Sequence, residues 1–551
     1  MTPTSALDAL LTGDGTETVD DAFSPAALAA LDADEEFPSR AVRALDEAGL
    51  PAHYVLPDGI ELPATVRLLR AVARRDLTVA IAHGKTFLGT APVWVAGTAE
   101  QITGLAERVR AADAVCWGLT ERGHGADLLA GELAAVAEDR GGWRLDGEKW
   151  LINNATRAAL ACVLARTDPV GGARGFSLFL VDRERLPEGS WRNLPKIRTH
   201  GIRGADISGF ALDGARVPAD ALIGGEGDGI PIVLKALQLT RIAVGALSLG
   251  AADHALRLAR DFATGRELYG RRLADIPHIR RVLGRAATSA LLAEAVSLLA
   301  TRSAHTLPGE LSVVAPIAKA YVPTVTQETL TTLGELLGVR GFLTSPPGDG
   351  FAKLERDHRI CAIFDGSTVV NRAALLNQLP RLARQLRRRR ADTDGVRAAA
   401  DLTAPLPPFA PDRLSLLSVT GCGAVQSLPD TVERVRRAGP PELAALTGPL
   451  LDELDLLEKE SAAFVPVAGG LPSAAFDLAE RYERAYAAAA CLLLWQENPG
   501  LRTGPLGAGA LWPRACLTAL LGAEDNAVSD AMAGVLLDWN APEFTLLGGA
   551  A

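Results

Sequence analysis

Gly118-Leu119-Thr120-Glu121-Arg122-Gly123-His124-Gly125-Ala126-Asp127 is the first of three stretches that decide the fold. The second reads Gly147-Glu148-Lys149-Trp150-Leu151-Ile152-Asn153-Asn154, and the third reads Ile363-Phe364-Asp365-Gly366-Ser367-Thr368. Small residues let backbone N–H groups approach a flat ring or a phosphate, which favours a ligand-binding loop in the first stretch. Each stretch alone also fits a plain loop, strand or turn, so the inference depends on their order and spacing.

The composition is that of an ordinary globular protein with several domains. The chain has 551 residues, of which 48% are apolar and 22% charged, and this length predicts two to four domains. The net charge of −10 argues against a nucleic-acid-binding protein, whose binding domain would be basic. Six scattered cysteines without a CxxC pair are typical of small buried residues in a reducing compartment.

The sequence also argues against targeting signals, membrane spans and several kinds of ligand site. No basic segment followed by an apolar core stands near Met1, so we expect no signal peptide, and we expect no apolar run long enough for a membrane span. We therefore predict a cytoplasmic protein. No group of His, Cys and carboxylates has metal-ligand spacing, and GxSxG, Walker A and Rossmann fingerprints are absent from the sequence, so no metal site is predicted.

Hydrophobic periodicity divides the chain into blocks. Residues 1–115 and 226–390 show helical spacing, and residues 116–225 hold short apolar runs separated by Gly, Asp and Pro, which predict a β-domain. Residues 391–411 contain a Pro-rich segment and are predicted to be a linker. Residues 412–551 return to helical spacing and are predicted to form an additional helical domain.

The three stretches, in this order, resemble motifs of the acyl-CoA dehydrogenase family of FAD-dependent flavoproteins. The resemblance covers roughly residues 20–390. It implies a mainly α fold with a β-barrel middle domain, in which two helical domains, the second a four-helix-type bundle, flank the barrel. The last block could match the C-terminal extension of some larger family members.

The resemblance implies which residues of the first two stretches contact FAD. The family signature Leu-Thr-Glu-Pro-Gly-Ala-Gly-Ser-Asp places Ala126 where a Ser holds the cofactor, and Arg122 where a Pro stands. In the strand, Leu151 takes the position of a Trp beside the flavin, and Asn153 takes that of a Thr that bonds N5. The implied contacts from both stretches are Trp117, Leu119, Thr120, Gly125, Ala126, Leu151, Ile152 and Asn153.

Further cofactor contacts are implied later in the chain. Arg266-Glu267-Leu268-Tyr269-Gly270 resembles the Arg-x-x-Phe-Gly segment that reaches the adenine-diphosphate half of FAD in a neighbouring subunit. An arginine fork suits a pyrophosphate. Leu336-Leu337-Gly338-Val339-Arg340-Gly341 resembles another FAD-contacting segment, with Gly338 in register and Glu335 in place of a Gln.

The third stretch carries the catalytic expectation. By alignment with the family motif, Asp365 takes the position of the base that removes a proton from an acyl thioester, where the family usually has Glu. Gly366 packs against the thioester and Ser367 lies near the FAD phosphates in that alignment. Arg241, on the first long helix, takes the place of an active-site arginine, and Thr240 precedes it where some branches have their catalytic Glu.

The function implied is α,β-dehydrogenation of an acyl thioester. The acyl carrier could be coenzyme A or a carrier protein, and reoxidation would use an electron-transfer flavoprotein or oxygen. We expect a homo-oligomer, with a dimer favoured because residues 412–551 could cover the surface through which dimers pair. Two alternatives stay open: a flavin oxidase or monooxygenase on the same fold, and a degenerate member retained as a binding or assembly protein.

Overall fold

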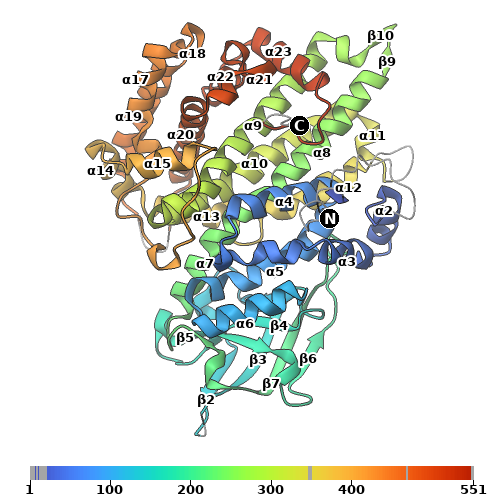
Figure 1. Ribbon diagram of the computed structural model, residues 1–551, viewed down its shortest axis with the longest axis vertical. Coiled ribbons are helices and arrows are strands. Elements are labelled where there is room, and N and C mark those ends of the chain that lie inside the picture. Colours follow the sequence, from blue (N-terminus) through green and yellow to red (C-terminus); the bar gives the residue numbers. More distant parts are fainter. Residues whose placement is uncertain are drawn as a thin grey trace. The chain divides into compact units, whose positions relative to one another are not determined.

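The computed structural model describes Leu7, Leu10, Leu11 and residues 22–139, 141–344, 350–466 and 470–547. It divides into two compact units, residues 1–240 and 241–551, and each is described here by itself (Figure 1). The first unit holds helices and a sheet, and the second is almost entirely helical. The helix α7 (Gly229–Ala243) crosses the division between the two units.

Among residues 22–115, five α-helices precede the sheet: α2 (Pro25–Ala33), α3 (Ser39–Glu47), α4 (Leu62–Arg75), α5 (Leu77–Ala96) and α6 (Ala99–Arg110). The ends of the later helices follow from capping residues. Asp76 accepts a hydrogen bond from the Val79 N–H at 2.9 Å at the start of α5, and Thr98 forms a capping box with Gln101 at the start of α6. The helix α5 is buried along most of its length and packs on the first strand.

The strands form one eight-stranded sheet in the order β6-β7-β3-β2-β4-β5-β8, with β1 paired to β4. They are β1 (Val115–Gly118), β2 (Ala134–Ala137), β3 (Trp143–Asn153), β4 (Leu160–Arg166), β5 (Phe176–Asp182), β6 (Trp191–Leu194), β7 (Ile207–Val217) and β8 (Leu222–Ile223). Phe179, Phe210 and Leu145 form part of its buried core. Because β1 runs parallel to β4 and contacts β3, the first motif stretch, which follows β1, starts beside the strand that carries the second.

The second unit is built on long helices that pack on α9. The elements before the extension are α8 (Gly245–Gly265), β9 (Glu267–Leu268), β10 (Arg271–Arg272), α9 (Pro277–Thr306), α10 (Leu311–Leu337), α11 (Val339–Phe342), α12 (Phe351–His358), α13 (Thr368–Leu376) and α14 (Leu379–Arg388). The helices α8 and α10 both pack against α9. The short 3-10 helix η9 (Arg359–Ala362) leads into the third motif stretch.

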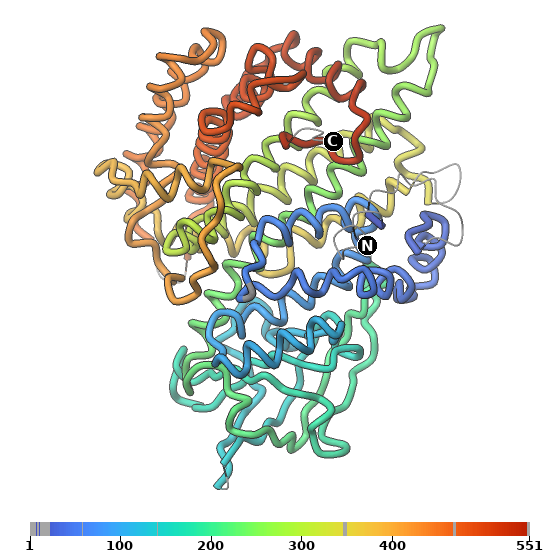
Figure 2. Tube along the Cα trace, in the orientation of Figure 1, coloured from blue at the N-terminus to red at the C-terminus, as the bar shows by residue number. Residues whose placement is uncertain are grey.

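The C-terminal block is helical and packs on the same bundle. Its helices are α15 (Thr393–Ala400), α16 (Gly423–Gln426), α17 (Leu428–Ala438), α18 (Pro441–Ala445), α19 (Thr447–Ala463), α20 (Ser473–Glu497), α21 (Gly504–Gly507), α22 (Leu511–Leu520) and α23 (Asn526–Leu537). Figure 2 shows the chain returning beside α9 near its end. A side chain on Gly284 of α9 would meet the Ser529 carbonyl oxygen of α23 at 1.8 Å, so this contact requires glycine.

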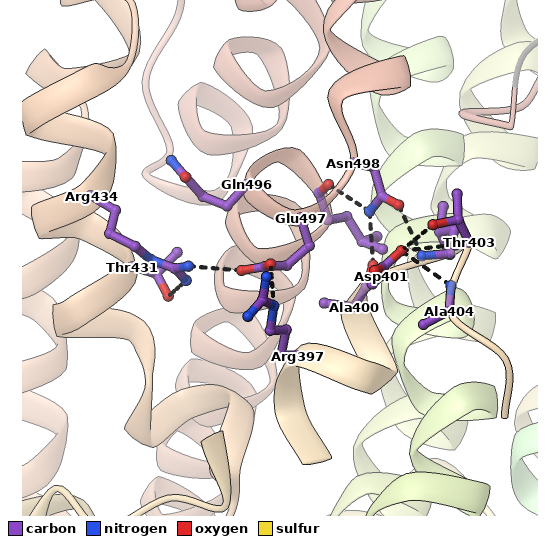
Figure 3. A network of polar contacts seen from close by, with 12 residues as sticks. Arg397, Ala400, Asp401, Thr403, Ala404, Thr431, Arg434, Gln496, Glu497 and Asn498 are labelled. Carbon is purple, nitrogen blue, oxygen red and sulfur yellow. Dashed lines mark hydrogen bonds and ion pairs between the residues drawn. The ribbon is translucent and has the colours of Figure 1, made fainter. Parts of the chain in front are cut away.

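A polar network fastens the end of α20 to its surroundings (Figure 3). Glu497 accepts a hydrogen bond from Arg434 at 2.7 Å and pairs with Arg397 at 3.3 Å. Asn498 donates to the Ala400 carbonyl at 2.8 Å and accepts from the Leu402 N–H at 2.9 Å. The extension is therefore tied to the segment that follows α15.

The predicted fold class is confirmed: the chain is mainly helical, with a central sheet and an additional C-terminal helical region. The end strands β6 and β8 do not pair with each other in the described part of the chain, so this barrel is open. The predicted linker contains the helix α15, and the buried Arg302 donates hydrogen bonds to the carbonyls of residues 398, 399, 401 and 404. The domain boundaries themselves stay a prediction.

The expectation that no apolar segment is long enough to span a membrane is wrong, as judged by segment length and composition alone. Residues 229–265 and 277–306 form helical segments that are long and apolar enough to cross a bilayer. Most of each segment is buried, as in the core helices of soluble proteins, so they are weak evidence for a membrane span. All six cysteines are buried, as predicted.

Candidate active site

A buried ion pair holds the first motif stretch against the second. Lys149 Nζ lies 2.7 Å from Glu121 Oε1, and both side chains are almost fully buried. Glu121 also accepts hydrogen bonds from the N–H groups of Glu132 and Leu133, at 2.6 and 3.1 Å. The same ammonium donates to the Leu119 carbonyl at 3.2 Å. The loop after β1 is therefore fixed to β3 by charged hydrogen bonds.

The charge state of this pair follows from its surroundings. Burial raises the pKa of the Glu121 carboxyl, but the adjacent Lys149 ammonium and the backbone donors outweigh burial, and the net pKa lies below its usual value. Glu121 is therefore ionised at neutral pH. Both residues belong to the motif stretches, but the sequence analysis predicted no role for either. A Lys in β3 whose side chain points to the core would have indicated the ion pair.

The end of β3 carries the residues expected beside the flavin. Leu151 has a left-handed backbone with φ of 57° and is 41% exposed, so it presents an apolar surface. Ile152 is buried in the sheet core. Asn153 Oδ1 and the nearby Trp117 Nε1 are buried polar atoms with no hydrogen-bond partner among the described residues. Such orphaned atoms fit a site that a polar heterocycle completes, as FAD would.

The loop after β1 leaves backbone available for a ligand. Thr120 accepts from the Trp150 N–H at 2.9 Å, which places the loop beside β3. Gly125 and Ala126 are exposed, and a Cβ on Gly125 would meet no atom within 4 Å. Arg122, which replaces the family's Pro, lies with its guanidinium 5.1 Å from the Trp150 ring. These residues could line the cofactor with backbone and apolar groups.

The third motif stretch forms a strained turn in the second unit. Asp365 is half-buried and has φ of 55°, and Gly366 follows with φ of 91°. A non-glycine residue in this region is uncommon and marks a conformation that the surroundings impose. Ser367 Oγ accepts from the Val370 N–H at 3.3 Å and caps α13. The turn thus places a carboxylate between η9 and α13.

Three buried side chains hold the carbonyls of this turn. Arg241 Nε donates to the Asp365 carbonyl at 3.1 Å, and Lys319 Nζ donates to those of Cys361 and Gly366 at 2.7 and 3.3 Å. Asn371 Nδ2 donates to the Gly366 carbonyl at 2.8 Å.

Burial lowers the pKa of the Arg241 guanidinium to about 10, although the Asp365 charge works in the opposite direction. Arg241 therefore stays charged at neutral pH. Lys319 was missed from the sequence, although a single Lys in the apolar run of residues 311–323 was a usable signal.

The remaining predicted residues lie on exposed turns of the second unit. The hairpin of β9 and β10 carries Arg266 and Tyr269, and the tyrosine is 99% exposed. Glu335 and Gly338 are exposed at the end of α10. The Arg340 guanidinium lies 5.7 Å from the Phe262 ring of α8, so the turn after α10 lies near the helix that leads into the hairpin.

The described ranges contain no group of three or more His, Cys, Asp or Glu residues that could hold a metal ion.

Two domains of the chain match family models of acyl-CoA dehydrogenases. Residues 116–215 match the acyl-CoA dehydrogenase middle domain, and residues 227–379 match the C-terminal domain of the same family. A probable acyl-CoA dehydrogenase of Mycobacterium tuberculosis is 28% identical over 360 residues, which cover 64% of this chain and 90% of that protein.

Solved structures extend the similarity in fold. An acyl-CoA dehydrogenase of Bacillus anthracis in complex with FAD superimposes with a TM-score of 0.67 at 19% identity. The aligned region covers 94% of this chain and 85% of the Bacillus chain. The prolyl acyl carrier protein oxidase AnaB has a TM-score of 0.59 at 19% identity and covers 68% of this chain and 97% of its own. The wider coverage by the first structure shows that its fold also includes a region like the extension.

The two domain matches, the similar relatives and the shared fold all indicate acyl-CoA dehydrogenases. The chain is therefore similar in sequence to acyl-CoA dehydrogenases over residues 116–215 and 227–379, shares their fold, and carries an additional C-terminal helical region.

Proposed function

We propose that the protein catalyses α,β-dehydrogenation of an acyl thioester with Asp365 as the base. The observation that carries this proposal is the turn itself: a half-buried carboxylate sits at φ of 55° with its own carbonyl held by Arg241 at 3.1 Å. Strain of this kind persists where the surroundings over-determine a conformation, which is common at active sites. Asp365 takes the α-proton of the thioester.

The neighbouring groups support this role. Gly366 lacks a side chain, and a Cβ there would approach Arg241 and Asn371 to 3.1 and 3.3 Å. A glycine at this point leaves room for a thioester beside the carboxylate. The Asp365 N–H would donate to the thioester carbonyl, which stabilises the enolate-like charge that develops as the proton leaves.

FAD, when bound, accepts the hydride from the β-carbon. We propose that the Asn153 amide would form a hydrogen bond with flavin N5 and that Leu151 would pack on the flavin ring system. The other proposed FAD contacts are Trp117, Leu119, Thr120, Gly125, Ala126, Ile152 and Ser367. Across a dimer interface, the exposed Arg266 and Tyr269 would contact the partner's cofactor, and the exposed Glu335 and Gly338 are further proposed FAD contacts. We also propose a cytoplasmic homodimer that uses an electron-transfer flavoprotein.

A second function has its own support. AnaB is a prolyl acyl carrier protein oxidase on this fold. This similarity favours, as the alternative function, an oxidase with a carrier-protein substrate and oxygen as the electron acceptor. The Asn at position 153 offers an amide where the family motif has a hydroxyl, and this changes the groups around N5. Rapid oxidation of reduced enzyme by oxygen would favour the oxidase or a monooxygenase.

The test begins with the visible spectrum of the purified protein. Bound flavin is expected, and its absence would favour the degenerate, non-catalytic alternative. Anaerobic addition of butyryl-, octanoyl- and palmitoyl-CoA, and of an acylated carrier protein, should bleach the flavin with at least one thioester. Asp365→Asn should keep FAD and lose bleaching, because the amide cannot take a proton. Bleaching of this variant at the parent rate would refute the assignment of the base.

A further inference from the structure

The turn that carries Asp365 is held mainly through its backbone carbonyls. Lys319 Nζ contacts the carbonyls of both Cys361 and Gly366, which stand on either side of Asp365 in the sequence. Arg241 contacts the carbonyl of Asp365 itself. The same lysine lies 5.5 Å from the ring of Phe364, the residue immediately before the base. One side chain therefore contacts the turn before and after Asp365.

Lys319 is placed where a charged side chain is expensive. It lies in the first third of α10 among apolar residues and is 1% exposed. Burying an ammonium costs several kcal/mol unless hydrogen bonds compensate. A lysine ammonium has three donors, and two of them go to carbonyls of this turn. A core that needed only packing here would be served better by Leu or Met.

The backbone shows what these contacts restrain. Asp365 and Gly366 both have positive φ, a backbone conformation that is uncommon for residues other than glycine. Fixing the carbonyls of Cys361 and Gly366 fixes both ends of the six-residue segment 361–366, and planar peptides then transmit this restraint to Asp365.

The identity of the base makes the restraint more important. The side chain of Asp is one methylene shorter than that of Glu, so it reaches about 1.5 Å less far from the backbone. Its position therefore depends on the turn more than on side-chain torsions. A displacement of about 1 Å at a reacting group can cost on the order of 100-fold in rate.

We propose that Lys319 is a positioning residue for the base: by holding the carbonyls of Cys361 and Gly366, it keeps Asp365 in the left-handed conformation from which its carboxylate reaches the substrate. The inference rests on the proposed role of Asp365. It assigns Lys319 no contact with substrate or cofactor, so its effect should fall on proton abstraction and not on thioester binding.

The test compares Lys319→Met with Lys319→Gln in FAD-loaded, full-length enzyme. The probe is whichever of butyryl-, octanoyl- or palmitoyl-CoA bleaches the parent fastest. Lys319→Met should lower the bleaching rate on the order of 100-fold with little change in KM. Lys319→Gln keeps an N–H donor and should recover part of the rate. Backbone amide exchange at residues 363–367 should accelerate in the Met variant.

Arg302→Met is the matched control. Arg302 is another buried cation of the second unit that donates to backbone carbonyls, at 2.6–3.0 Å, but it holds residues 398–404. This variant should lose thermal stability as Lys319→Met does, while its folded fraction bleaches at the parent rate. If Lys319→Met does not fold, Lys319→Gln and Lys319→Arg take its place in the same comparison.

The outcomes separate the two proposals. If Asp365→Asn bleaches at the parent rate, the base is another group and the proposed function fails first. If Asp365→Asn is inactive but folded Lys319 variants bleach at the parent rate, only the positioning role is overturned. An equal fall in rate for Arg302→Met and Lys319→Met would also overturn it, because the loss would then reflect general destabilisation.

Discussion

Removal of the buried Lys149 charge should destabilise the first unit and loosen the loop after β1, for which we propose FAD contacts. In Lys149→Met the Glu121 carboxylate keeps its two backbone donors, at 2.6 and 3.1 Å, but loses an ammonium at 2.7 Å. Breaking a buried pair by removing one partner costs about 3–5 kcal/mol, because the remaining charge stays buried. The two surviving donors place the expected loss near the lower end, about 3 kcal/mol.

This loss is large enough to measure by heat denaturation. For a unit of 240 residues, about 3 kcal/mol corresponds to a fall in Tm of roughly 6–12 °C. FAD should dissociate more readily, because Lys149 also holds the Leu119 carbonyl at 3.2 Å. Calorimetry gives the Tm, and flavin fluorescence on dilution gives the release of FAD. The pKa of Glu121 lies below its usual value, so the effect should be full at neutral pH and shrink as pH falls through the acid range.

Two further variants control the measurement. Arg192→Met removes an exposed ion pair with Glu148, one residue away from Lys149, and should cost less than about 1 kcal/mol. The double variant Glu121→Gln with Lys149→Met removes both charges and should be more stable than Lys149→Met alone. A Tm for Lys149→Met equal to that of Arg192→Met, with FAD retained as in the parent, would refute the reasoning.

Three other predictions follow from separate features. Asp365→Glu should lower the bleaching rate if the turn is built around Asp, whereas a rate above the parent would show that the shorter base weakens the site. Burial raises the pKa of Glu310 to about 7, so the unfolding free energy should fall by about 3 kcal/mol as pH rises from 4.5 to 7. Glu310→Gln should abolish this pH dependence of the unfolding free energy, measured by denaturation at several pH values. An unchanged pH dependence would exclude Glu310 as its source. Arg266→Ala should release FAD faster while light scattering still reports a dimer; unchanged retention would exclude a phosphate contact by Arg266.

Much of the fold was predictable because it depends on local pattern. Short apolar runs separated by Gly, Asp and Pro predicted the sheet, and helical spacing predicted the helices that precede and follow it in the sequence. The predicted linker shows the limit of composition: residues 391–411 contain α15, which forms where Arg302 supplies donors to the backbone. That donor lies about 100 residues away, and no local pattern records it.

The sequence alone determined the family motifs and therefore the order of the candidate groups, from Trp117 to Ser367, because motif residues are recognised by type and spacing. Only the tertiary structure decided how these groups are held. Glu121 meets Lys149 across 28 residues, and Lys319 meets Gly366 across 47. The physical reason is that a buried charge is stable only beside partners that folding brings to it, and those partners lie outside any local window of the chain.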